Sequence, residues 1–159
     1  DVYKRQLEIR KVPMTAYTEE WLSRQIVEKA ADAIIFADTE GIIRLWNTGA
    51  EDIFGYPADE AIGQSLDLIV PEKMRKRHWA GYRKVMATGK TKYGKGTLAV
   101  PAITKSDNRI SIEFTIVLVT SDSGEPLGTA AVIRDVTERW QKQKELKKRL
   151  KELEGKDSH

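Results

Sequence analysis

Two histidines and no cysteine occur among the 159 residues, so few side chains could act as a nucleophile, proton carrier or metal ligand near neutral pH. Only His78 lies in a segment whose pattern predicts folded structure, because His159 is the last residue. An imidazole changes its charge near neutral pH and, when neutral, is a common metal ligand. His78 is therefore the first candidate for a functional side chain.

The residue inventory argues against an enzyme. A zinc site of the usual kind needs several His, Cys or carboxylate ligands, and one internal histidine without cysteine does not supply them. A serine–histidine–acid site would have to be built around His78, and no glycine–serine–glycine elbow motif supports one. We therefore expect a binding or sensing module.

The elements around His78 follow from apolar periodicity and turn residues. The run from Pro71 to Gly89 predicts a helix, because proline suits the first helical position and glycine suits the position after the last turn. Runs of β-branched and aromatic residues predict strands on both sides of this helix, at 33–38, 42–46, 97–104, 110–120 and 128–135. Short helical pieces are expected between 47 and 70.

These elements predict an α+β fold, with a five-stranded antiparallel sheet, short helices on one face and amphipathic flanking helices at both ends. The expected parts are an artefactual or disordered extension at 1–13, an amphipathic helix at 14–31, the sensor domain at 32–138, and a signalling or coiled-coil helix with a disordered end at 139–159.

Several segments together resemble a PAS domain over roughly 28–140. The resemblance is carried by residues 33–47 (AIIFADTEGIIRLWN), 50–56 (AEDIFGY), 62–63 (IG) and 133–139 (IRDVTER). Within that superfamily, the chain is most similar to the haem-binding PAS domains of FixL-type oxygen-sensor kinases. As in that pattern, His78 stands eight residues before Met86, which opens the run Met-Ala-Thr-Gly; Val70 replaces the first methionine of the pattern. The resemblance implies that His78 is the proximal ligand of a b-type haem.

The residues make a weaker, separate case for the same site. On a helix, side chains four residues apart share a face, so Met74, His78 and Tyr82 should line one side of a slot. Lys84 and Lys92, with other nearby cations, could meet haem propionates. The opposite wall would come from strand residues, namely Leu98, Val100, Ile112, Phe114, Ile116 and Val132.

Plainer readings of the same residues stay open. A lone histidine on a basic helix is usually a solvated or capping residue, and Trp79 beside it suits packing or an interface. Strand aliphatics form a core with or without a cofactor. The rival functions are a haem-free PAS module for dimerisation or protein interaction, and a PAS domain that binds flavin or another small ligand.

The other side of the expected pocket departs from the family pattern. Leu98 stands where oxygen-sensing relatives place an arginine, and Tyr93 is the one nearby hydroxyl. Because bound oxygen gains from a hydrogen-bond donor and carbon monoxide gains little, we expect a gas sensor that binds CO or NO well and O2 less securely.

The end of the chain suggests how a signal leaves the domain. Leu146, Leu150 and Leu153 are spaced four and three apart, as in a short heptad stripe, which favours a homodimer through the flanking helices. A single amphipathic helix folded against the domain is the alternative. An output domain or partner protein is expected elsewhere. The net charge of +3 gives no reason to expect nucleic-acid binding, and no apolar run predicts a membrane span, so we expect a cytoplasmic protein.

Overall fold

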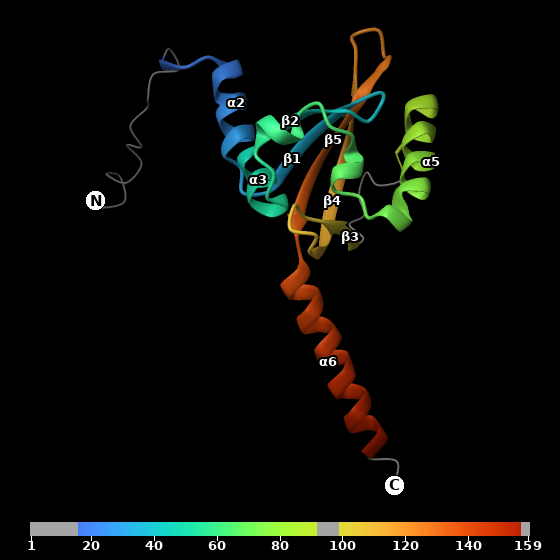
Figure 1. Ribbon diagram of the computed structural model, residues 1–159. Helices are drawn as coiled ribbons and strands as arrows, with labels where there is room; N and C mark the ends of the chain where they lie inside the picture. Colours follow the sequence, from blue (N-terminus) through green and yellow to red (C-terminus); the bar gives the residue numbers. More distant parts are fainter. Residues whose placement is uncertain (1–15, 92–98, 157–159) are drawn as a thin grey trace, which may run out of the picture.

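The computed structural model describes residues 16–91 and 99–156. Its elements alternate as the sequence predicts, with two strands, a set of helices and then three strands (Figure 1). In chain order they are α2 (Glu19–Lys29), β1 (Ala33–Asp38), β2 (Ile43–Trp46), α3 (Thr48–Phe54), α4 (Ala58–Ala61), the 3-10 helix η2 (Leu66–Leu68), α5 (Glu72–Thr88), β3 (Val100–Ile103), β4 (Arg109–Thr120), β5 (Pro126–Asp135) and α6 (Thr137–Lys156).

The strands form one antiparallel sheet in the order β2-β1-β5-β4-β3, which confirms the predicted α+β fold. β1 and β2 form the predicted hairpin, with Ile35 opposite Trp46. β5 lies in the middle of the sheet and pairs with β1 on one side and β4 on the other. The last strand in sequence is therefore held on both edges before the chain continues into α6.

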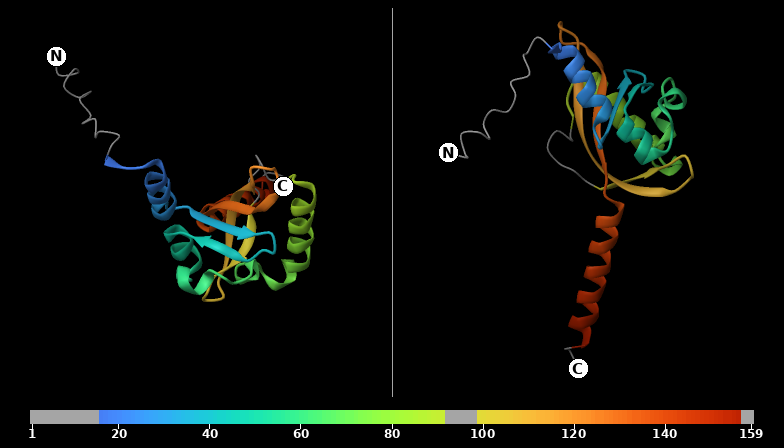
Figure 2. Two further views of the ribbon diagram at one scale, coloured as in Figure 1. Left: turned by 90° about the horizontal axis from the view of Figure 1, so that it is seen from above. Right: turned by 90° about the vertical axis from the view of Figure 1, so that its left-hand side faces the viewer.

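The helices between β2 and β3 lie on one side of the sheet (Figure 2). Along β1, Ala33, Ile35 and Ala37 are buried and alternate with more exposed residues, so one face of the strand points into the core. The inner faces of the sheet and the helices α3 and α4 together bury a single cluster of residues, which includes Ile43, Trp46, Ala50, Phe54, Ala61, Ile112 and Ile133. This face of the sheet is called the inner face below.

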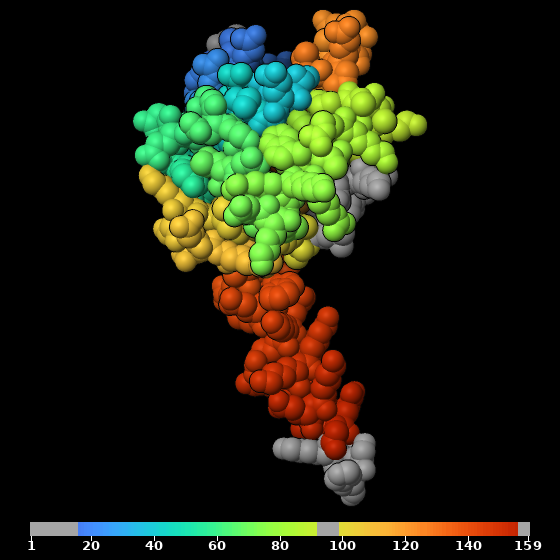
Figure 3. Space-filling model, turned by 45° about the vertical axis from the view of Figure 1, so that its right-hand side comes forward, coloured from blue at the N-terminus to red at the C-terminus, as the bar shows by residue number. Residues whose placement is uncertain are grey.

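Both flanking helices are present within the described residues. The lead helix predicted at 14–31 is α2, and the hydroxyl of Thr18 accepts a hydrogen bond from Trp21 N at its start. α6 projects away from the domain (Figures 1 and 3). Its three leucines are 58–60% exposed, so within the described residues α6 does not fold back to bury this stripe. None of the described helices is both long and apolar enough to cross a membrane.

Candidate functional site

His78 sits in the middle of α5, which begins and ends as the sequence predicts. Pro71 precedes the first turn, where Glu72 favours the positive end of the helix dipole. Gly89 ends the helix in the left-handed conformation (φ +66°), and its N–H donates to Val85 O over 2.9 Å. The helix therefore presents His78 on a defined face.

The imidazole of His78 is half-buried and has an unused polar atom. Its Nδ1 is buried and has no hydrogen-bond partner among residues 16–91 and 99–156. The His78 ring lies edge-on to Trp79, with centroids 4.9 Å apart, and 6.0 Å from the ring of Tyr82. Burial lowers the pKa of His78 below the ordinary value of 6.5, and the negative charge of Asp67 opposes this only in part. The ring is therefore held in its neutral form near pH 7, which is the form that ligates a metal.

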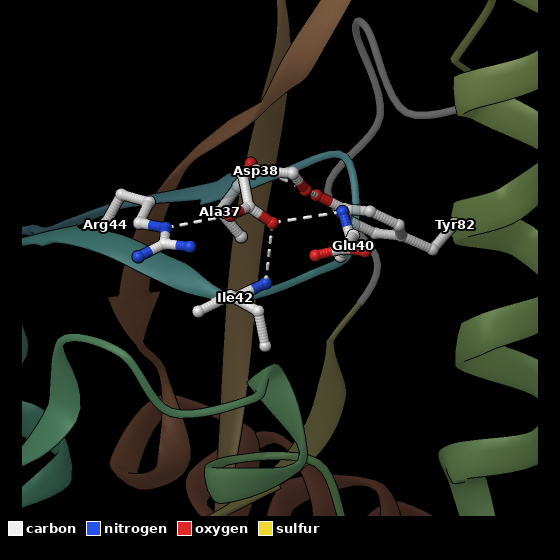
Figure 4. Close-up of polar contacts among 6 residues, drawn as sticks. All are labelled: Ala37, Asp38, Glu40, Ile42, Arg44 and Tyr82. Atoms are coloured by element: carbon white, nitrogen blue, oxygen red, sulfur yellow. Dashed lines mark hydrogen bonds and ion pairs between the residues drawn. The ribbon is translucent and has the colours of Figure 1, made fainter.

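Aromatic and polar contacts fasten α5 to the hairpin of β1 and β2. The Tyr82 hydroxyl donates to the backbone carbonyls of Ala37, over 3.1 Å, and Asp38, over 2.5 Å (Figure 4). The indole of Trp79 lies against Gly41 in the hairpin turn, and its Nε1 donates to Asp67 Oδ1 over 2.7 Å. Trp79 is therefore a packing residue, which is one of the two roles considered for it from the sequence.

The hairpin turn itself is well ordered by Asp38. Its Oδ1 accepts from the backbone N–H groups of Glu40 and Ile42, and its Oδ2 accepts from Arg44 Nε over 2.8 Å (Figure 4). Burial alone would raise the pKa of Asp38, but the hydrogen bonds from Arg44 and the two backbone groups lower it overall. Asp38 therefore stays ionised and keeps the turn in place beside α5.

The inner face of β4 carries much of the predicted apolar wall. Ile112 is 6% exposed, while Phe114 and Ile116, further along the strand, are only half-buried. A Cβ atom at Gly89 would lie 3.9 Å from Leu118 Cδ2, so the end of α5 lies beside this strand. The inner-face residues of β4 are thus more exposed at Phe114 and Ile116, toward the end of α5, than at Ile112 in the central core.

The other predicted site residues fall into three groups. Val100 lies opposite Ile112 in the β3–β4 pairing, as a shared wall requires. Met74 is half-buried on α5, and Lys84 is exposed on the same helix. Lys92, Tyr93 and Leu98 lie outside the described residues, so the expectations for the side of the pocket opposite His78 stay predictions.

Val132 does not lie on the face of the sheet that the sequence predicts for it. It is 37% exposed and pairs with the exposed Thr115, whereas its neighbour Ile133 is 4% exposed and pairs with Phe114. Successive strand residues point to opposite faces, so Val132 belongs to the outer face of the sheet. The inner-face residues of β5 are Ala131 and Ile133, which replace Val132 as wall residues.

Three residues that contact α5 or belong to it make contacts that the sequence did not predict. Asp67, from η2, accepts the Trp79 bond, and Arg75 donates to the backbone carbonyls of Asp67 and Val70. Gly41 gives the indole of Trp79 room, since a Cβ at Gly41 would lie 2.2 Å from that ring. The sequence shows a glycine in the hairpin turn and a tryptophan on a later helix, but no pattern in it links Gly41 to Trp79 or Asp67 to α5.

The donor set bears on which cofactor could bind. Among residues 16–91 and 99–156, no group of three His, Asp or Glu side chains could hold a metal ion. A single histidine suits an iron porphyrin, which would bring its own nitrogen ligands and need one more donor from the protein. Two hollows on the described surface lie at the start of α6 and further along it, and neither includes His78. Residues between 134 and 142 line the first, and residues between 141 and 149 line the second.

The chain belongs to the PAS-fold family. Residues 27–141 match the family described as PAS fold, and this match covers most of the chain. The PAS domain predicted from the sequence is thereby confirmed, and the chain is a sensor domain of this fold.

The chain is also similar to curated sensor proteins. It is 33% identical over 139 residues to Sensor protein FixL of Bradyrhizobium diazoefficiens, covering 86% of this chain and 26% of that relative. It is 28% identical over 126 residues to the signal transduction histidine-protein kinase AtoS of Escherichia coli, covering 79% of this chain and 19% of the relative. The chain thus spans about a quarter or less of the length of these relatives.

Solved structures support the same fold. The crystal structure of a PAS domain from Colwellia psychrerythraea has a TM-score of 0.67 and 22% identity, covering 76% of this chain and 99% of that chain. The structure of an RNA-binding light-oxygen-voltage receptor has a TM-score of 0.70 and 19% identity, covering 89% of this chain and 39% of that one. At these identities the similarity concerns the fold.

Proposed function

We propose that this PAS domain is a haem-binding sensor in which His78 is the axial ligand of a b-type haem. The observation that carries the proposal is the buried Nδ1 of His78, which has no hydrogen-bond partner among the described residues. Buried polar atoms are normally satisfied, so an unused one points to a missing partner. The lowered pKa of His78 and the similarity to Sensor protein FixL support the same reading.

The residues that would hold the haem come from α5 and from the inner face of the sheet. His78 would supply the axial nitrogen, with Met74 on the same helix. The half-buried Phe114 and Ile116 would supply apolar contacts across from it. Exposed cations on α5, among them Lys84, would meet the propionates. Such a site combines one strong donor, an apolar face and a charged rim, as b-type haem requires.

When bound, the haem iron would supply reversible binding of a diatomic gas, CO, NO or O2, or a change of redox state. The protein's part is to keep the His78 imidazole neutral and oriented, and to exclude water from the apolar face. Leu98 in place of a donor at the expected gas-facing position favours CO and NO over O2. Tyr93 is the one nearby hydroxyl that the sequence offers, and like Leu98 it lies outside the described residues. We propose no catalytic activity for the domain.

The signal would leave through the flanking helices to an output domain or partner protein elsewhere. Leu146, Leu150 and Leu153 are exposed on α6, although a lone helix of this length gains little stability without burying an apolar face. A second copy offers the same stripe, so a parallel homodimer would bury both. The same observation favours the second candidate function, a haem-free PAS module that works by dimerisation alone.

A hemin titration tests the proposal. The full chain should develop an intense Soret band near ~400–430 nm at one equivalent of haem, whereas a flavin would absorb more weakly near ~450 nm. His78→Ala should lose tight binding, and added imidazole should restore part of the ligated spectrum. His159→Ala, which removes the other histidine, is the matched control and should bind haem as the wild type does. Equal binding by His78→Ala, or an unliganded wild-type chain, would refute the assignment.

A further inference from the structure

We propose that Tyr82 is a positioning residue whose hydroxyl locks the His78 helix onto the central strands of the sheet. Tyr82 is 8% exposed, and its ring lies 6.0 Å from that of His78 and 5.5 Å from that of Trp79. Its hydroxyl donates to two carbonyls of β1, those of Ala37 and Asp38. Figure 4 shows Tyr82 reaching from α5 toward Ala37 and Asp38. The side chain thus joins the rings of His78 and Trp79 to the end of β1.

The strand end that receives this contact makes several hydrogen bonds of its own. Asp38 O also accepts from Gly41 N over 2.9 Å, and Asp38 N donates to Ile42 O over 3.0 Å. The Asp38 carboxylate adds bonds to Glu40 N, Ile42 N and the Arg44 side chain. Of the two carbonyls that accept from Tyr82, that of Asp38 therefore belongs to a turn held by its own hydrogen bonds.

Trp79 makes a second attachment on the same turn, but of a different kind. Its indole packs on Gly41 and donates to Asp67, so it ties α5 to the hairpin tip and to η2. Tyr82 instead reaches the strand end itself. The two contacts can therefore be separated by substitution, and the hydroxyl of Tyr82 is the one aimed at the strand.

The strand end that Tyr82 contacts is coupled directly to β5. Ala37 pairs with Thr129 and Asp38 pairs with Gly128. A Cβ atom at Gly128 would lie 2.0 Å from Ala37 O, so only a glycine permits this close approach. β5 then runs to Asp135, and α6 begins at Thr137. A displacement of α5 would thus be passed by the Tyr82 hydroxyl to β1 and from there to β5, the strand that precedes α6.

The lock is tested first in the ligand-free full chain, by hydrogen exchange of backbone amides. Tyr82→Phe removes the hydroxyl and keeps the ring. Amides of α5 and of residues 37–42 should exchange about tenfold faster, the change expected when one net hydrogen bond of ordinary strength is lost. Tyr56→Phe is the matched control, because Tyr56 packs on Trp46 away from α5, and it should leave both segments unchanged. Unchanged exchange in Tyr82→Phe would overturn the proposal.

Should Tyr82→Phe fail to fold, the wild-type protein still decides the question. A locked helix opens together with the strand end, so α5 and residues 37–42 should show the same opening equilibrium. If α5 opens at least 100-fold more often than residues 37–42, the lock does not exist.

Transmission to α6 rests on the proposed haem function and is tested separately with hemin. In the wild type, hemin should change exchange in α5, in β5 and at the start of α6. In Tyr82→Phe, compared at a hemin concentration that saturates the Soret band of each protein, the change in β5 and α6 should disappear. A retained change in β5 and α6 would contradict the lock as the route. Absence of hemin binding by the wild type would refute the proposed function, while the ligand-free exchange result would still decide the lock.

Discussion

Replacing Asn47 by alanine should be among the most destabilising single changes in the domain. Asn47 is 4% exposed and lies where α2, β1 and α3 meet. Its Oδ1 accepts from Ile34 N over 2.8 Å and from Ala50 N over 2.9 Å, the second being the N-cap bond of α3. Its Nδ2 donates to Val27 O over 2.8 Å and to Asp32 O over 3.0 Å.

The expected loss in the free energy of unfolding follows from these contacts. Loss of an N-cap side chain costs about 1 kcal/mol. Each buried backbone group left without a partner adds about 1–3 kcal/mol, less where water can enter. Since the carbonyl of Val27 lies in an exposed helix, water can satisfy part of the loss. We therefore expect Asn47→Ala to lower the free energy of unfolding by about 3–5 kcal/mol.

Urea unfolding measures this directly, because the buried Trp46 adjoins Asn47 and reports on the core by fluorescence. Asn108→Ala is the matched control: Asn108 is exposed in the turn before β4, and its replacement should change the free energy of unfolding by no more than about 0.5 kcal/mol. A loss below about 1 kcal/mol in Asn47→Ala would show that this hydrogen-bond junction does not stabilise the fold as reasoned here.

Three further outcomes are expected. The pKa of His78 is lower in the folded than in the unfolded state, so below about pH 6.5 the unfolded chain binds more protons and the free energy of unfolding falls as the pH drops. Urea unfolding between pH 7.5 and 5 should show this pH dependence, and His78→Gln should reduce it. Ile133→Ala should cost about 2–4 kcal/mol in thermal or urea unfolding and Val132→Ala about 1 kcal/mol or less, and the reverse order would reinstate Val132 as an inner-face residue. Leu150→Ser should weaken a dimer through α6 about 100-fold in sedimentation equilibrium, since two leucines lose their buried partner surface, while an unchanged mass would place the dimer contact elsewhere.

The succession of strands and helices along the chain could be predicted because local rules decide it. The turn at Gly41, the β-branched run of β1 and the start of α5 after Pro71 each carry their own signal, and the structure places elements at all three. The antiparallel pairs β1–β2, β3–β4 and β4–β5 follow from the short turns between these strands, whereas β1 and β5 pair across distant parts of the chain. The end of α5 at Gly89 was equally readable, because glycine adopts the left-handed conformation found there.

The site was less readable, because it depends on contacts between distant segments. Val132 faces outward because it pairs with Thr115, and a shift of one residue in the β4–β5 pairing would turn it inward. A continuous apolar run, such as the one around Ile133, does not show which of its residues face inward. The Tyr82 contact with β1 joins residues 44 and 45 positions apart, and Asp67 reaches Trp79 from a separate turn. His78 could be singled out because the chain offers so few alternatives, whereas its surroundings required the fold.

The bond between His78 and haem iron can be tested directly by magnetic-resonance measurement of nitrogen hyperfine coupling. The full chain is prepared with ¹⁵N-histidine, loaded with unlabelled hemin and compared with an unlabelled sample. We predict a hyperfine coupling that changes with the histidine label in wild type and in His159→Ala, and that is absent in His78→Ala. A spectrum insensitive to the histidine label, or one in which the coupling persists without His78, would contradict haem ligation by this residue.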